Sequence, residues 1–223
     1  MTTKLPASGK SGWPDAAFLA LIAAWTRDQA DILLGFVWAA YDSMLADMPA
    51  VDCRDLERSI TQLLEPRIDK AMTGDEPFYI QHGSFEHETM SSPPAQPPAY
   101  DLAFVLRAEE RIMWPIEAKV LETPRRIAEY DRDVREEFLK CRYAPFSGGG
   151  GMLGYLLTGS AVDALKAIEA KLGCTLELVP TFAARPHRAS NHQRTVPAGK
   201  NYPSEFRCHH LIMEYPGLAR STN

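Results

Sequence analysis

The sequence predicts an α/β protein, and two patterns along the chain lead to this prediction. Some segments carry apolar residues at every second position, and others carry them at every third or fourth position. The first pattern is typical of strands and the second of helices. Several of these segments alternate as strand, helix, strand, helix, strand, which favours a sheet covered by helices. The length of 223 residues suits one domain with a helical extension.

Composition and charge exclude several classes of protein. The formal net charge is −5, so any surface that binds nucleic acid must be a local basic patch. The four cysteines are far apart and form no CxxC pair, which favours free thiols in a reducing cytosol over a zinc ribbon or a disulfide framework. The apolar run from Ala16 is broken by Arg27 and Asp28. We therefore expect a cytoplasmic protein without a signal peptide or a membrane span.

The chain is expected to fall into three parts. Residues 1–13 form a polar tail, residues 14–50 a helical extension and residues 51–223 an α/β domain. Helices are predicted over Ala16–Trp25 and Ile32–Met48, and the second has one broad apolar stripe. We interpret this stripe as packed on the sheet. A subunit interface, in a homodimer or with a partner subunit, is the alternative.

A further helix and a first strand precede the most informative part of the chain. Apolar residues at helical spacing predict a helix over Leu56–Met72, in which Pro66 is expected to cause a kink or an end. Glu57 lies beside the apolar stripe of this helix. A strand is predicted over Phe78–Phe85.

The segment Tyr100–Leu121 predicts two antiparallel strands joined by a short charged turn. Alternate residues of both strands form an apolar face, to which Tyr100 is also assigned. Asp101 lies on the opposite face of the first strand, and Glu117 and Lys119 share the opposite face of the second. Pairing of the strands is therefore expected to bring the two carboxylates and the ammonium group together.

This trio suits metal-dependent chemistry on a phosphate. Carboxylate oxygens are the ligands that Mg²⁺ and Mn²⁺ prefer, so Asp101 and Glu117 predict a site for one of these ions. Lys119 can hold or activate a water molecule, or neutralise charge that develops on the phosphate. A solvated Glu–Lys pair on a strand is the alternative interpretation.

Asp101 followed by the run EAK at 117–119 resembles the active-site signature of the PD-(D/E)xK superfamily, the restriction-endonuclease-like nucleases. The residue before the aspartate is Tyr100 here, in place of the usual proline. The resemblance implies a restriction-endonuclease-like central mixed sheet flanked by helices. It also implies that Asp101 and Glu117 bind the metal and that the lysine orients or activates the attacking water. Many members carry a glutamate on the helix before the first core strand, and Glu57 matches it; a solvated helical glutamate is the alternative.

The rest of the chain completes the alternation of helices and strands. Thr123 and Pro124 predict the start of a helix that returns across the sheet. Four successive glycines at 148–151 predict a flexible connector, and close approach of the backbone to a ligand is the alternative. The remaining predicted elements are a strand at Met152–Leu157, a helix at Ala161–Leu172, and strands at Cys174–Phe182 and Phe206–Tyr215.

The segment Ala184–Lys200 is the most basic part of the chain and contains no acidic residue. We predict a loop that contacts phosphate, with a solvated loop as the alternative. The residues assigned to this contact are Arg185, Arg188, Arg194 and Lys200. A zinc site is disfavoured because the spacing of its possible ligands matches no known pattern. Those ligands are His187, His192, Cys208 and His209.

The predicted function is that of a Mg²⁺-dependent endonuclease that hydrolyses phosphodiester bonds, with DNA as the favoured substrate. The sequence EAK…KCRYAPFSGGGGMLGYLL is also similar to nuclease-like proteins of bacterial mobile elements and anti-phage loci, which implies a role in defence. The competing hypothesis is a catalytically inactive nuclease-fold protein that binds nucleic acid or serves as an assembly subunit. The acidic net charge and the apolar N-terminal helices support that alternative.

Overall fold

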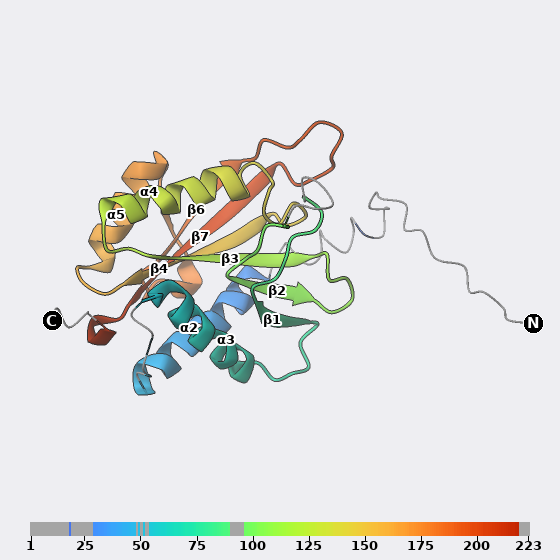
Figure 1. Ribbon diagram of the computed structural model, residues 1–223. Helices are drawn as coiled ribbons and strands as arrows, with labels where there is room; N and C mark the ends of the chain where they lie inside the picture. Colours follow the sequence, from blue (N-terminus) through green and yellow to red (C-terminus); the bar gives the residue numbers. More distant parts are fainter. Residues whose placement is uncertain are drawn as a thin grey trace, which may run out of the picture.

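The computed structural model describes residues 18, 29–47, 49, 51, 54–89 and 96–218. The predicted tail at residues 1–13 lies outside the described residues, as does nearly all of the first predicted helix. The described residues form a seven-stranded mixed sheet with the strand order β1-β2-β3-β4-β7-β6-β5. Helices cover both faces of this sheet, with α4 and α5 on one side and α2 and α3 on the other (Figure 1). The prediction of an α/β protein is confirmed.

The helices and strands have the following bounds. The helical elements are α2 (Ala30–Asp47), α3 (Leu56–Ala71), α4 (Pro124–Arg132), the π-helix η1 (Asp133–Phe138), α5 (Ala161–Leu172), and the short 3₁₀ helices η2 (Pro180–Phe182) and η3 (Pro216–Leu218). The strands are β1 (Phe78–His82), β2 (Leu102–Leu106), β3 (Met113–Val120), β4 (Gly149–Leu156), β5 (Glu177–Leu178), β6 (His187–Gln193) and β7 (Glu205–Glu214).

The sheet combines an antiparallel half with a parallel centre. Strands β1, β2 and β3 form an antiparallel meander. Strand β4 then pairs parallel to β3, and β7 pairs parallel to β4, because α4 and α5 carry the chain back across the sheet between them. Strands β6 and β5 extend the far side in antiparallel pairing.

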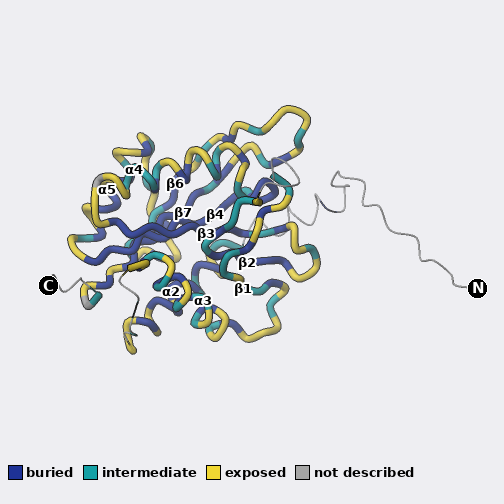
Figure 2. The backbone as a smooth tube through the Cα atoms, viewed as in Figure 1, coloured by how far each residue is buried: buried dark blue, intermediate teal, exposed yellow. Residues whose placement is uncertain are grey.

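Two hydrophobic cores lie on the two faces of the sheet. The larger core packs α2 and α3 against the apolar faces of the central strands. The second packs α4, η1 and α5 against the opposite faces of β4 and β7. The central strands therefore run through the interior as the buried tube in Figure 2. Leu33, Leu34 and Val37 of α2 are completely buried in the larger core, so this helix belongs to the same packed body as the sheet.

The glycine run adopts a different structure from the predicted connector. Gly149, Gly150 and Gly151 form the buried start of β4. A Cβ atom on Gly150 would lie 3.0 Å from the ring of Phe206, and one on Gly151 would lie 3.2 Å from the ring of Trp114. Glycine is required here because neighbouring aromatic side chains approach the strand closely.

The basic segment also differs from its prediction, because residues 187–193 form β6 where a loop was expected. This stretch contains no β-branched or large apolar residue, so its strand conformation comes from pairing with β7 along its whole length. The strand predicted over Cys174–Phe182 is reduced to β5, since Pro180 begins a 3₁₀ turn. Pro66 does not end α3, whose buried face anchors the helix on both sides of it.

Candidate functional site

Asp101, Glu117 and Lys119 meet where β2 begins beside β3. The antiparallel register of the two strands places Asp101 next to Glu117. The Oδ2 atom of Asp101 accepts a hydrogen bond from the backbone N–H of Ala118 at 2.8 Å. Alternation along β3 turns Ala118 into the larger core and leaves Glu117 and Lys119 together on the other face. The three predicted residues are therefore neighbours.

Lys119 lies at the centre of this group. Its Nζ atom is 3.3 Å from Oε1 of Glu57, 3.1 Å from Oδ2 of Asp133 and 3.7 Å from Oε1 of Glu117. The same ammonium group donates a hydrogen bond to the carbonyl of Ala118 at 2.7 Å. We call the side chains of Glu57, Asp101, Glu117 and Asp133 around Lys119 the acidic cluster.

Glu57 reaches the acidic cluster from the first turn of α3. Asp55 caps this helix by accepting a hydrogen bond from the N–H of Arg58, which fixes the helix start at Leu56, directly before Glu57. One Glu57 oxygen contacts Lys119, and Oε2 accepts a hydrogen bond from the N–H of Val120 at 3.2 Å. Glu57 thus binds both the side chain and the backbone at the end of β3.

Asp133 is the member of the acidic cluster that sequence reasoning missed. It begins the π-helix η1, in which the N–H of Leu139 donates to the carbonyl of Val134, five residues earlier, at 3.0 Å. Such wide turns occur often at functional sites. Asp133 follows the buried Tyr130 by three positions, so a carboxylate on the apolar face of the helix was the available signal.

Burial and neighbouring charges both shift the pKa values of Glu117 and Lys119. Burial raises the pKa of Glu117 well above its usual range, and the negative charge of Asp101 adds to the effect. Burial alone would lower the pKa of Lys119, but the charges of Glu117 and Glu57 outweigh it and raise that pKa above its ordinary value. Lys119 is therefore a stable cation at neutral pH.

The acidic cluster has the chemistry to hold a hard cation. Glu117 is only 7 % exposed, and its Oε2 atom is buried without a hydrogen-bond partner among the described residues. Asp101 supplies a second carboxylate beside it. In the described part of the chain, no group of three or more His, Cys, Asp or Glu side chains is arranged to hold a metal ion. Glu57, Glu117 and Asp133 form ion pairs with the ammonium group of Lys119 in this structure.

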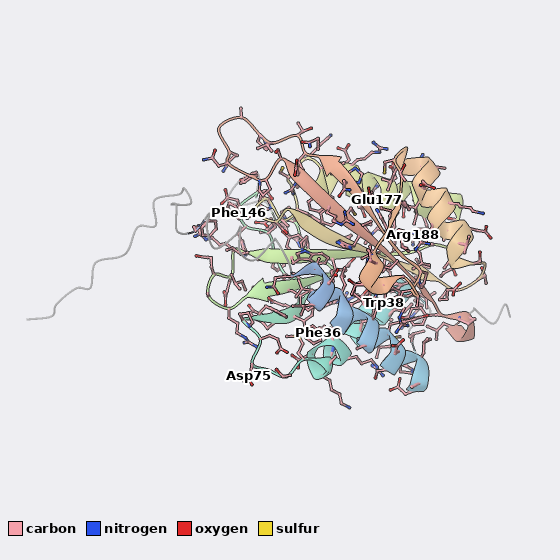
Figure 3. The ribbon with its side chains drawn as sticks, turned by 180° about the vertical axis from the view of Figure 1, so that it is seen from behind. Phe36, Trp38, Asp75, Phe146, Glu177 and Arg188 are labelled. Atoms are coloured by element: carbon pink, nitrogen blue, oxygen red, sulfur yellow. The ribbon has the colours of Figure 1, made fainter. Side chains whose placement is uncertain are left out.

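Two of the four basic residues predicted to contact phosphate are paired with acidic side chains. Arg185 binds Asp42 of α2 through both terminal nitrogens, at 2.8 and 2.5 Å. Lys200 lies 2.9 Å from Oε1 of Glu88. Arg188 lies on β6 beside β5, near Glu177 (Figure 3), and donates to its neighbouring backbone carbonyl. These three side chains do not gather around the acidic cluster in one basic patch.

The fourth, Arg194, follows β6 and has a structural role, because its side chain binds the loop after η1. It is only 7 % exposed, and each nitrogen of its guanidinium group donates to a backbone carbonyl at 2.7 to 3.1 Å. The carbonyls belong to Phe138, Tyr143, Ala144 and Ser147. This loop contains two non-glycine residues with positive φ, Cys141 at 57° and Ala144 at 38°. Arg194 thus holds a strained loop in place.

The histidines divide between the two faces of the sheet. Toward α2, Nε2 of His187 lies 3.1 Å from Nδ1 of His209, and the indole N–H of Trp38 donates to Nδ1 of His187 at 3.2 Å. Toward α4, the hydroxyl of Ser190 contacts both His192 and His210. This arrangement places His187 and His192 on opposite faces of the sheet. The possible zinc ligands named from the sequence therefore do not come together, in agreement with the expectation that a zinc site is disfavoured.

Comparison of the chain with protein-family models, with curated proteins and with solved structures found no match. In the part of the chain that the structure describes, no helix has the length and apolar character needed to cross a membrane. The geometry of the acidic cluster is therefore the basis for assigning a function.

Proposed function

We propose that the protein is a metal-dependent nuclease that hydrolyses phosphodiester bonds at the acidic cluster. The observation that carries this proposal is the buried Oε2 atom of Glu117, which receives no hydrogen bond from an N–H or O–H donor of the described residues and lies beside Asp101 and close to Lys119. A buried carboxylate oxygen without a partner is costly unless a ligand completes it. A hard divalent cation such as Mg²⁺ or Mn²⁺ is the ligand that suits it.

In this proposal Asp101 and Glu117 hold the cation, which when bound would polarise a phosphoryl oxygen and acidify a water molecule. Lys119 holds the attacking water or neutralises the charge that develops on the phosphate. Because its pKa is raised, Lys119 acts as a hydrogen-bond donor and a cation, and it does not act as a general base.

Glu57 and Asp133 have supporting roles in the same proposal. Their carboxylates lie 3.3 and 3.1 Å from the ammonium nitrogen of Lys119 and fix its position from two different helices. The mixed sheet flanked by helices and the contact of Glu57 with Lys119 support the proposal, since the resemblance to restriction-endonuclease-like proteins implies such a sheet and such a glutamate. DNA is the first substrate to test, and a role in bacterial defence is the context that the resemblance suggests.

Cleavage assays on plasmid DNA, single-stranded DNA and RNA test the proposal, each with Mg²⁺ or Mn²⁺ and with a chelator. Wild-type protein is expected to cut at least one substrate only when metal is present. Lys119→Ala should lower the rate about a hundredfold or more, because the charge that stabilises the reacting phosphate is removed. Lys166→Ala, which removes an exposed lysine of α5, is the matched control and should cut like the wild type.

Metal binding provides a second measurement that does not require the substrate. Isothermal titration with Mn²⁺ should show binding to the wild type and to Glu122→Gln, an exposed carboxylate of the same region. Glu117→Ala should abolish it. A silent titration of the wild type would contradict the metal site. Metal binding without cleavage of any substrate would favour the competing hypothesis of a nuclease-fold binding protein.

A further inference from the structure

A pocket of about 430 Å³ opens beside the antiparallel half of the sheet. Its volume lies within the range typical of small-ligand sites. Side chains of β1, β2 and β3 form one wall, and the turn that follows β1 forms the other. Its main apolar lining comes from Tyr79, Phe85, Val105 and Met113, and its main polar lining from Ser84, Glu86, Glu88 and Glu110.

The pocket lies on the same sheet face as the acidic cluster. Val105 belongs to a small buried group with Ala103, and both share a face with Asp101 because they follow it at steps of two. On β3, Met113 in the pocket wall likewise shares a face with Glu117. Val105 lies four residues from Asp101, and Met113 lies four residues from Glu117. The pocket wall therefore begins roughly 13 Å along the strands from the acidic cluster.

The polar lining of the pocket includes hydrogen-bond acceptors that lie on the turn after β1. The hydroxyl of Ser84 is buried and has no partner among the described residues. Glu86 is 3 % exposed, and its two oxygens accept from the hydroxyl of Tyr100 at 2.5 Å and from the N–H of Glu88 at 2.9 Å. Burial raises the pKa of Glu86 to about 7. The unpaired acceptor of the pocket among the described residues is therefore the hydroxyl of Ser84, and the Glu86 oxygens can accept a further donor only beside those that they already bind.

The apolar wall offers a surface for stacking. The side chain of Phe85 is 43 % exposed, and its backbone forms an isolated bridge with Ala99 beside the sheet. Arg111 also lines the pocket, and Arg107 stacks over the ring of Tyr79 at 5.4 Å. A flat ring with N–H donors would meet an aromatic face and buried acceptors at this place, beside Arg111, which is itself paired with Glu109.

We propose that this pocket binds an amino-bearing nucleobase, turned out of an unpaired stretch of the nucleic acid that the acidic cluster cleaves. The inference rests on the proposed nuclease function and names its substrate class as single-stranded or locally unpaired nucleic acid. Bases within a duplex keep their rings stacked, so they do not enter such a pocket. Adenine, cytosine and guanine carry the exocyclic amino group that the acceptors can bind, and thymine does not.

Nucleoside binding, followed by ligand-detected NMR without metal, tests the pocket separately from catalysis. Adenosine, cytidine and guanosine should bind the wild type at millimolar concentrations, with thymidine about tenfold weaker. Phe85→Ala should weaken adenosine binding about fivefold or more, because a stacking surface is lost. Leu178→Ala, another exposed apolar residue at the opposite edge of the sheet, is the matched control. Lys119→Ala should bind nucleosides normally.

Single-stranded DNA with one abasic position, moved stepwise past the cut, extends the test to catalysis. For the wild type, removal of the base at one position near the cut should lower the cleavage rate. For Phe85→Ala, removal of the same base should leave the cleavage rate unchanged. Nucleoside binding that is equal in the wild type and in Phe85→Ala would overturn the pocket assignment. Binding of spermidine in place of nucleosides would overturn it as well, since it would indicate a site for amines. Loss of cleavage in all samples with intact nucleoside binding would instead count against the nuclease function alone.

Discussion

At Glu117, burial and charge oppose each other within a single side chain. The carboxylate is nearly inaccessible, one oxygen has no partner among the described residues, and its ion-pair distance to Lys119 is the longest of the three, at 3.7 Å. Surroundings that disfavour the charged form of a side chain are frequent at functional sites. The acidic cluster therefore loses stability at Glu117 in the absence of a ligand.

This conflict predicts that Glu117→Gln stabilises the metal-free protein at alkaline pH. Because the folded-state pKa of Glu117 is raised, its stabilising effect is full below the ordinary carboxyl pKa and is lost as pH rises. The variant should therefore gain roughly 1 to 2 kcal/mol of unfolding free energy over the wild type at pH 9, and less at pH 5. Urea unfolding in a chelating buffer measures the difference.

Glu122→Gln is the control for that comparison and should follow the wild-type pH profile, because its side chain is exposed. A variant less stable than the wild type at both pH values would show that Glu117 acts as a structural partner of Lys119. Addition of Mn²⁺ should stabilise the wild type and leave Glu117→Gln almost unchanged.

At the scale of elements, the close packing around β4 and the open space around Gly35 of α2 predict opposite effects for two glycine substitutions. A Cβ atom on Gly154 would lie 2.5 Å from Cδ1 of Leu121 and 2.7 Å from Cδ1 of Ile212. Gly154→Ala should therefore cost about 1 to 3 kcal/mol of unfolding free energy. Gly35→Ala, within α2 and with no atom in reach of its Cβ, should add about 0.5 to 1 kcal/mol. Chemical denaturation of both variants checks the signs, and destabilisation by Gly35→Ala would contradict the packing of α2.

Local periodicity was sufficient to predict most elements, and it failed where long-range contacts decide. The helix over Ala161–Leu172 agrees with α5 because its spacing and its terminal Gly173 are local signals. Strand β6 has no such signal, since its conformation depends on β7. Tyr100, assigned to the apolar face, instead packs with Ala103 and Val105, because its hydroxyl bonds to Glu86.

The acidic cluster shows the same division between local and long-range information. Alternation along β2 and β3 was enough to place Asp101, Glu117 and Lys119 near one another. Glu57 came from the resemblance, because a helical glutamate carries no signal of its own. Asp133 depends on a π-helix, and no periodic pattern of the sequence indicates that the α-helix widens at that residue.

At the scale of the whole molecule, α2 is tied to the sheet by polar contacts as well as by the core. The indole N–H of Trp38 donates to the buried His187, and the hydroxyl of Tyr41 donates to the carbonyl of Glu214 at 2.9 Å. The helical extension therefore packs on the sheet, as its apolar stripe predicts, and the division of the chain at residue 51 stays a prediction. Both contacts join residues more than a hundred positions apart, which explains why sequence spacing alone did not reveal them.

A chain that begins at residue 51 is accordingly predicted not to fold. Removal of α2 would expose the faces of α3 and of the central strands that the larger core covers. Its amide NMR spectrum should lack dispersion, and its circular dichroism should show no cooperative thermal transition. The full chain with Trp38→Phe, which keeps an aromatic ring but loses the indole N–H donor and part of the buried volume, should fold with a lower melting temperature. A cooperative transition in the shortened chain would identify a separate domain.

The contacts of the Arg194 guanidinium group are expected to form late in folding. Its partners at residues 138–147 are synthesised some 50 positions earlier, at sequence separations from 47 to 56. The loop that follows Asp133 can therefore reach its final conformation only after β6 has docked, late in folding and after nearly the whole chain has left the ribosome. A nascent chain that ends before residue 194 thus lacks the side chain that fixes this loop, which follows directly after the π-helix of Asp133.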